Sequence, residues 1–380
     1  MVWARVRVLI GFGAFGVFWG TWGALIPEIR QRARVDDGEL GLAVLMIGIG
    51  ALCSMRPAGA AVDRFGRSAV AACLLLMAVA AVLPGLARGA PALMAALAVL
   101  GAASGAVDVA VNSLASEEEQ RTGRLMNAAH ACFSAAVLLG ALATGLALGH
   151  RLAADTVLLL AAALLAGAAA AICLRREEAH LDRPAQPRHR PGVARRPLLL
   201  LGGLCALAFL VENAWQSWSA VMLRSVFGLG PGPAAAGPVV FAASAAVGRL
   251  AGHGLAARLS QRRLLVLGAT VAALGTLGAA LAPGAATMLA GLVVAGLGTS
   301  VCAPTILSLA GARAQPGTRS AAVSVVASVG YLGFLIGPAA VGLTASAAGL
   351  RTALTGVAGA AVLLACAASL SLPPQEPAQR

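Results

Sequence analysis

Apolar stretches long enough to cross a lipid bilayer recur along the whole of this 380-residue chain. A membrane-spanning helix needs about 20 predominantly apolar residues to cross the hydrocarbon core. Twelve such stretches can be marked, at residues 8–27, 40–61, 69–87, 92–115, 127–149, 153–174, 198–223, 234–256, 264–282, 286–310, 321–346 and 352–372. The predicted fold class is therefore an all-α polytopic membrane protein with twelve transmembrane helices, and the even number of spans places both termini on one side.

The composition agrees with a membrane protein and excludes several soluble classes. Apolar residues make up 59% of the chain and charged residues 11%, with a mean hydropathy of +0.86, whereas soluble domains carry about 25% charged residues. A water-soluble enzyme, a disordered chain and a disulfide scaffold are excluded. The net charge is +13, and every basic residue is arginine. Because these arginines stand in short gaps between apolar stretches, they indicate orientation in a lipid bilayer and argue against a nucleic-acid partner.

The distribution of arginine predicts which way the chain crosses the membrane. With the N-terminus in the cytoplasm, 19 arginines fall in inside segments and 7 in outside loops, and inside loops of membrane proteins carry the excess of positive charge. We therefore expect a multi-pass protein of the cytoplasmic (inner) membrane with both termini inside. The first apolar stretch follows Arg5 and Arg7, but it is too long for a signal peptide and is expected to remain as the first helix.

The longest polar segment, residues 175–196, divides the spans six and six. It is rich in Pro and Arg and is expected to be a cytoplasmic linker whose basic residues contact anionic headgroups. It is expected to be a solvated hinge, and the alternative is a regulatory or partner-binding segment. The predicted organisation is an N-terminal six-helix half at 1–174, a linker at 175–197, a C-terminal six-helix half at 198–372 and a cytoplasmic tail at 373–380. We expect the chain to act as a monomer.

The two halves resemble each other at a nearly constant offset. Trp19 and Trp22 precede Trp215 and Trp218 by 196 positions, and Ser-Leu-Ala at 113–115 precedes Ser-Leu-Ala at 308–310 by 195. A shared offset in span order indicates duplication. Two parallel repeats around an axis along the membrane normal are a transporter architecture, with the binding site between the halves near mid-membrane.

A motif with a clear physical logic stands between the second and third spans: Gly59-Ala-Ala-Val-Asp63-Arg64-Phe-Gly66-Arg67. Gly59 allows a close helix contact, Gly66 permits a tight turn, and Asp63 can pair with an arginine or a helix N-terminus. The motif closely resembles the loop signature of the major facilitator superfamily, G-x-x-x-D-R-x-G-R. That resemblance implies a gating role for these five residues, as a conformational latch between the halves. The second-half copy is degraded, with Ala257 where the acid would stand.

Three further stretches resemble the fucose-permease-like branch of that superfamily. They are WGTWGALIPEIR (19–30), DVAVNSLASEEEQRTGRLMNAAHACFS (108–134), and ENAWQSWSAVMLR (212–224) with VGYLGFLIGP (329–338). The resemblance implies proton-coupled symport of a sugar-like solute, with Asp108 as the proton relay and Asn127 and His130 in the matching part of the fifth span. This chain departs from the sugar symporters of that branch in its first helix. Those symporters can carry a second membrane acid there, whereas this helix has no acid before Glu28 at its outer end.

Two acids lie inside the spans, where an ionisable group is costly and marks a functional site by default. Asp108 shares a helical face with Gly101, Gly105 and Asn112, at spacings typical of a cavity wall or a tight helix contact. The structural alternative is an acid that pairs with Arg56 or Asn112 to hold helices together.

Glu212 stands beside Asn213 in the seventh span, with Trp215 and Gln216 on nearly the same face. We expect Asp108 and Glu212 to couple transport to protons. The alternative for Glu212 is a buried, hydrogen-bonded acid that fixes its helix.

Polar and aromatic residues in the spans complete the predicted substrate site. It comprises Trp19, Asn112, Asn127, His130, Asn213, Trp215, Gln216 and Tyr331. Each has a structural alternative: tryptophan anchors helices at the headgroup level, and a histidine near a helix end can be a simple hydrogen-bonding group. Arg56 and Arg249 are near enough to the inner surface to extend their guanidinium groups to it.

No metal, cofactor or hydrolytic motif is present in the sequence. The seven cysteines all fall in spans without C-x-x-C spacing, and there is no Walker loop, zinc motif or G-x-S-x-G. We therefore expect no cofactor, no metal and no enzymatic activity. The predicted function is secondary active transport of a small-molecule substrate by alternating access, coupled to protons and directed to sugar-like uptake. The alternatives are export of small amphipathic compounds and a non-transporting membrane sensor on the same scaffold.

Overall fold

The computed structural model describes residues 2–122, 125–173, 195–256, 258–314 and 319–372, and within these ranges the chain is helical with no strand. Twelve helical segments are long and apolar enough to cross a membrane. The predicted all-α class with twelve spans is therefore confirmed. The linker residues 174–194, the tail 373–380 and the motif position Ala257 lie outside the described residues.

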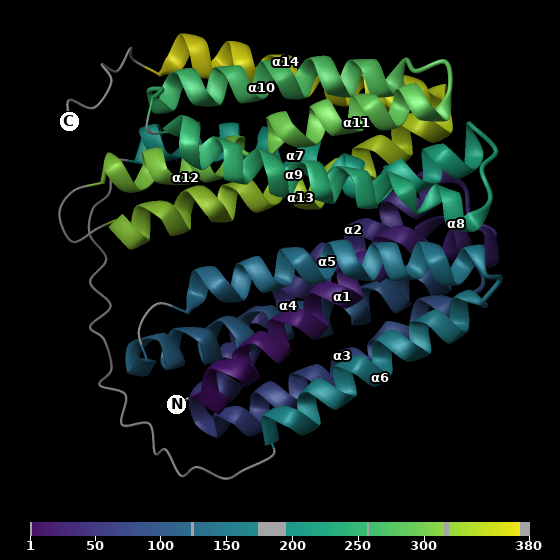
Figure 1. The fold of residues 1–380 in the computed structure, drawn as a ribbon, viewed down its shortest axis with the longest axis vertical. Coiled ribbons are helices and arrows are strands. Elements are labelled where there is room, and N and C mark those ends of the chain that lie inside the picture. Colours follow the sequence, from purple (N-terminus) through teal and green to yellow (C-terminus); the bar gives the residue numbers. More distant parts are fainter. Residues whose placement is uncertain (1, 123–124, 174–194, 257, 315–318, 373–380) are drawn as a thin grey trace.

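The helices form two bundles that follow each other in the sequence (Figure 1). The N-terminal bundle consists of α1 (Val2–Ala33), α2 (Asp37–Phe65), α3 (Arg67–Leu86), α4 (Gly89–Thr122), α5 (Met126–Gly149) and α6 (Ala154–Cys173). The C-terminal bundle consists of α7 (Arg195–Ser225), α8 (Pro231–Ala234), α9 (Ala236–Ala256), α10 (Gln261–Ala280), α11 (Ala285–Thr299), α12 (Cys302–Ala312), α13 (Arg319–Ala348) and α14 (Leu350–Ser371). Helices α8 and α9 together make the eighth span, and α11 and α12 make the tenth.

The break in the tenth span, at Ser300 and Val301, has a local cause in the sequence. Pro304 has no backbone N–H to donate to the carbonyl of Ser300, and its ring crowds that carbonyl. The hydroxyl groups near the break turn back to the helix, since Ser300 Oγ donates to the Leu297 carbonyl at 2.8 Å and Thr305 Oγ1 to the Val301 carbonyl at 2.6 Å. The predicted span 286–310 did not include this interruption.

The tight turn predicted at Gly66 is confirmed, and the start of α2 has an equally local cause. The chain turns between α2 and α3 at Gly66, whose φ of +54° lies in the left-handed region that favours glycine. Asp36 opens α2 with a capping box, in which Asp36 Oδ1 accepts from the Glu39 N–H at 2.8 Å and Glu39 Oε2 accepts from the Asp36 N–H at 3.0 Å.

The first helix continues six residues beyond its predicted end at 27, to Ala33. Ion pairs hold this extension against its neighbours: Arg30 pairs with Asp37 at 2.9 Å, and Arg32 pairs with Asp155 at the start of α6. Hydropathy alone places the end of a span at the edge of the hydrocarbon, whereas a helix can extend into water where charged side chains find partners.

The two bundles contact each other mainly at one end. We call the end where α1 begins at Val2 and α14 ends at Ser371 the terminal side, and the opposite end the far side (Figure 1). On the far side, a β-carbon at Gly41 of α2 would lie 2.9 Å from the α-carbon of Gly342 of α13, and one at Gly145 of α5 would lie 2.9 Å from the β-carbon of Ala235. In the described chain, the tight glycine contacts between the bundles all lie in the far-side half.

Glycine also sets the packing within each bundle. A β-carbon at Gly101 of α4 would lie 2.0 Å from the carbonyl oxygen of Ile47 in α2, and one at Gly105 would lie 2.6 Å from the α-carbon of Ala51. Such close approach lets helix backbones pack by van der Waals contact where no hydrophobic force acts between helices. Of the two interpretations of the Gly101–Gly105 face, the structure therefore shows the tight helix contact.

We predict that Gly101→Ala destabilises the protein by roughly 1–3 kcal/mol, because the new methyl group must displace backbone of α2. Gly167→Ala in α6 is the matched control, since a β-carbon there would have nothing within 4 Å. It is expected to leave stability unchanged or to raise it by up to about 1 kcal/mol. Thermal unfolding of both variants in detergent measures the difference, and equal midpoints would contradict the α2–α4 packing.

Candidate functional site

Asp108 lies in α4 on the terminal-side half of the membrane-spanning region, where it is partly buried. Asn112, one turn later, donates through Nδ2 to Asp108 Oδ1 at 3.1 Å and to the Asp108 carbonyl at 2.9 Å. Among the described residues no arginine pairs with Asp108, and Arg56 is exposed without an ion-pair partner. The alternative pairing with Asn112 is therefore observed, and the pairing with Arg56 is not.

Polar groups from three helices and both bundles gather around Asp108. Its carboxyl group interacts electrostatically with His130 of α5 and with Tyr331 of α13. His130 is exposed, and Tyr331 is 46% exposed although it lies well inside its span. The three residues were predicted separately from the sequence, and the tertiary structure places them together. The side chain of Asn127 lies outside the described residues.

Aromatic rings flank this polar group on both sides. In the C-terminal bundle, the rings of Phe209, Tyr331 and Phe334 form a mutual cluster with centroid separations of 6.1, 6.2 and 6.3 Å. In the N-terminal bundle, Phe12 meets the His130 ring edge-on at 5.2 Å. Tyr331 was predicted as a site residue, but Phe209 and Phe334 were not, since phenylalanine in an apolar span carries no distinguishing signal.

The second intramembrane acid has a different environment. Glu212 is 9% exposed, and its Oε1 accepts from Arg249 of α9 at 3.0 Å and from Gln216 Nε2 at 3.2 Å. Arg249 therefore does not simply extend to the membrane surface: it neutralises a buried carboxylate 37 positions earlier in the chain. The two residues lie in different helices, so no local pattern could have indicated the pair.

Two predicted substrate-binding residues belong instead to the core of the C-terminal bundle. Trp215 is 0% exposed, and its Nε1 donates to Thr276 Oγ1 of α10 at 3.1 Å. Asn213 donates through Nδ2 to the Phe334 carbonyl of α13 at 2.6 Å. Their positions correct the expectation that they line a cavity, because α7 packs against other helices on those faces. Trp19 remains partly buried, in edge contact with Phe15 and Phe18.

The predicted gating motif lies at the terminal side. Asp63 and Arg64 are exposed, and the Arg64 guanidinium carbon lies 5.2 Å from the centre of the Phe65 ring. A β-carbon at Gly59 would lie 3.6 Å from Val109, an ordinary van der Waals distance. The close approach expected at Gly59 is therefore absent in this structure, and the tight α2–α4 contacts lie farther from the motif, at Gly101 and Gly105.

We predict that Glu212 and Arg249 are energetically coupled. Glu212→Gln and Arg249→Gln should each lower the stability, whereas the double variant should lose less than the sum of the two. The interaction energy is expected near the lower end of roughly 0.5–3 kcal/mol, because the Arg249 side chain is partly exposed. Thermal unfolding of the parent, both single variants and the double variant gives this value. If the stability losses of the two single variants simply add up in the double variant, the predicted coupling is wrong.

The known proteins similar to this chain include members of a transporter family. A model of the major facilitator superfamily matches residues 8–291 and 254–380. An MFS-type transporter of Yersinia pestis, described as uncharacterised, is 32% identical over 371 residues, which cover 96% of this chain and 94% of that protein. Membrane protein MosC of Rhizobium meliloti is 30% identical over 360 residues, covering 93% of this chain and 86% of that protein.

Solved structures share the same fold at much lower sequence identity. A bacterial homologue of the human lysosomal transporter Spinster, in an inward-facing and occupied conformation, matches with a TM-score of 0.79 and 16% identity, covering 96% of this chain and 95% of that chain. The nucleoside transporter NupG matches with a TM-score of 0.79 and 14% identity, covering 96% of this chain and 98% of that chain. With a family model that spans nearly its whole length, this chain belongs to the major facilitator superfamily.

Proposed function

We propose that this protein is a proton-coupled secondary transporter that moves a small solute across the cytoplasmic membrane by alternating access. The observation that carries the proposal is the environment of Asp108. Its carboxyl group lies between the bundles, hydrogen-bonded to Asn112 and near His130, without an arginine partner in the described chain. A carboxyl group without a fixed counter-charge inside a membrane can gain and lose a proton at little structural cost, because desolvation opposes its charged form.

The two intramembrane acids take different roles in this proposal. Asp108 carries the proton, with His130 of one bundle and Tyr331 of the other in its electrostatic surroundings. Glu212 is paired with Arg249 and serves to fix α7 against α9.

The arrangement of the bundles supports an inward-facing conformation. The bundles close against each other on the far side, and the arginine distribution assigns the terminal side to the cytoplasm. Asp108, His130 and Tyr331 would then be reached from the cytoplasm. The motif residues Asp63 and Arg64 lie at that same side, where a latch between the bundles would form on closure of the cytoplasmic side.

Two solute classes follow from different observations. Sugar-like uptake rests on the resemblance to the fucose-permease-like branch. Export of a small amphipathic compound is favoured by the ring cluster of Phe209, Tyr331 and Phe334, because partly exposed rings near an acid suit a solute with a flat apolar part and a polar group.

We predict that Asp108→Asn abolishes accumulation driven by a pH gradient, because the amide cannot exchange a proton. The measurement is a flux screen in proteoliposomes with an imposed pH gradient, over a panel of sugars and of small amphipathic compounds. Glu117→Gln is the matched control, since Glu117 lies on the same helix beyond the apolar stretch and should leave the flux unchanged.

The same assay separates the alternatives. Gradient-driven accumulation by Asp108→Asn at the parental rate would exclude the proton role of Asp108. Solute exchange that persists in Asp108→Asn without gradient-driven accumulation would support it, because binding and alternating access would then survive the loss of coupling. A parent protein that moves none of the panel would favour the non-transporting sensor.

A further inference from the structure

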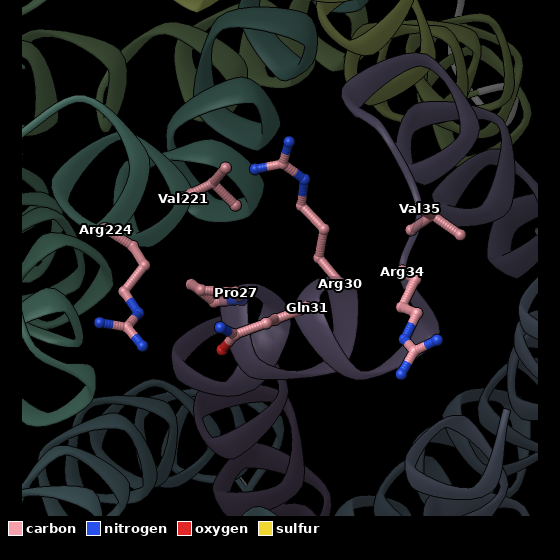
Figure 2. Close-up of a pocket in the computed structure, with 7 residues that line it drawn as sticks. All are labelled: Pro27, Arg30, Gln31, Arg34, Val35, Val221 and Arg224. Atoms are coloured by element: carbon pink, nitrogen blue, oxygen red, sulfur yellow. The ribbon is translucent and has the colours of Figure 1, made fainter. Parts of the chain in front are cut away.

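A pocket of about 430 Å³ lies between the far-side ends of α1 and α7 (Figure 2). Its lining residues are Pro27, Arg30, Gln31, Arg34, Val35, Val221 and Arg224. The first five come from the N-terminal bundle and the last two from the C-terminal bundle, so the pocket lies on the boundary between the bundles. It shares no residue with the polar group around Asp108, which lies toward the opposite side of the membrane.

The pocket wall carries a net positive charge. Three of its seven lining residues are arginines and none is acidic. Arg30 and Arg224 have carboxylate partners outside the lining, Asp37 at 2.9 Å and Glu28 at 3.4 Å. Arg34 is exposed and has no ion-pair partner among the described residues, which leaves one positive charge uncompensated.

Unused hydrogen-bond donors accompany this charge. The buried Nε of Arg30 has no hydrogen-bond partner in the described chain. In the view of Figure 2, the amide of Gln31 lies between the side chains of Arg34 and Arg224. A buried donor without an acceptor is costly, and an anion in the pocket would supply the acceptor that Arg30 Nε lacks.

We propose that this pocket binds the anionic group of a small solute, a carboxylate or a phosphate. Guanidinium groups present paired N–H donors that match the geometry of both anions. Pro27, Val35 and Val221 supply an apolar wall for the carbon part of the ligand. The volume falls within the range of about 300–1,000 Å³ typical of small-molecule sites. The proposal holds whether or not transport is coupled to protons.

The position of Arg224 connects this site to the contact between the bundles. Arg224 lies 196 positions after Glu28, the same offset that relates Trp19 to Trp215. Its ion pair with Glu28 therefore joins equivalent positions of the two repeats across the bundle boundary. An anion that engages Arg224 competes with Glu28, so binding should weaken one of the contacts that hold the far side closed.

The experiment measures thermal unfolding of the protein in phosphatidylcholine nanodiscs with increasing citrate, succinate, glycerol 3-phosphate or inorganic phosphate at constant ionic strength. We expect a saturable rise of the midpoint with at least one of these anions. Arg34→Gln and Arg224→Gln should weaken the apparent affinity about tenfold or more, because each removes a charge-assisted hydrogen bond. Arg34→Gln disturbs no ion pair in the described chain, so its folding is expected to be intact.

Two further variants sharpen the test. Glu28→Gln should increase the apparent affinity, because it removes the carboxylate that competes for Arg224. Arg151→Gln is the matched control, since Arg151 is an exposed arginine on the same side of the membrane and outside the pocket. The absence of a saturable response to all four anions, or equal losses in Arg34→Gln and Arg151→Gln, would overturn the proposal.

A second arm identifies the source of the anion. In nanodiscs that contain one third phosphatidylglycerol, a lipid headgroup in the pocket would raise the midpoint of the parent without added anion, and Arg34→Gln would lose that rise. A parent midpoint that is independent of lipid charge, together with a saturable citrate or phosphate response, assigns the pocket to a water-soluble anion.

Discussion

The cost of an ionised group in hydrocarbon governs where every charged side chain of this protein lies. Of the 28 arginines, all but Arg56 and Arg249 stand outside the predicted spans, in segments that water or headgroups can solvate. Inside the spans, the charge of Glu212 is neutralised by Arg249, whereas Asp108 is held by an amide and lies near a histidine. That contrast is between an acid with a fixed cationic partner and an acid without one, and the proposed mechanism follows from it.

Close backbone packing is the second constraint, because lipid tails remove the hydrophobic force that drives helices together in water. Glycine allows this close backbone packing both within each bundle and between the bundles. Gly101 and Gly105 fix α4 against α2 within a bundle, and Gly41 and Gly145 bring the two bundles together on the far side. The same residue type therefore builds both the rigid units and the boundary between them, which must open for a solute to pass.

Charge at the bundle boundary also differs between the two sides of the membrane. On the far side, Glu28 of α1 pairs with Arg224 of α7 next to the arginine-lined pocket, and the bundles are closed there. On the terminal side, Asp63 and Arg64 of the loop motif are exposed. In alternating access, the bundles close on one side of the membrane only when they open on the other. Ionic contacts between the bundles can bias the equilibrium between these two conformations, and they are weak enough to break when the conformation changes.

Local sequence patterns determined the twelve spans, the turn at Gly66 and the capping box at Asp36, because each depends on residues within a few positions of one another or on the hydropathy of a single stretch. The repeat offset and the loop motif likewise indicated the superfamily. Tertiary structure alone decided the partner of Glu212, the burial of Trp215 against Thr276 and the meeting of Asp108 with Tyr331. These contacts depend on the rotation of each helix about its own axis, which decides the face that it presents to its neighbours. In a bundle where nearly every face is apolar, the periodicity of one helix carries too little information to set that rotation.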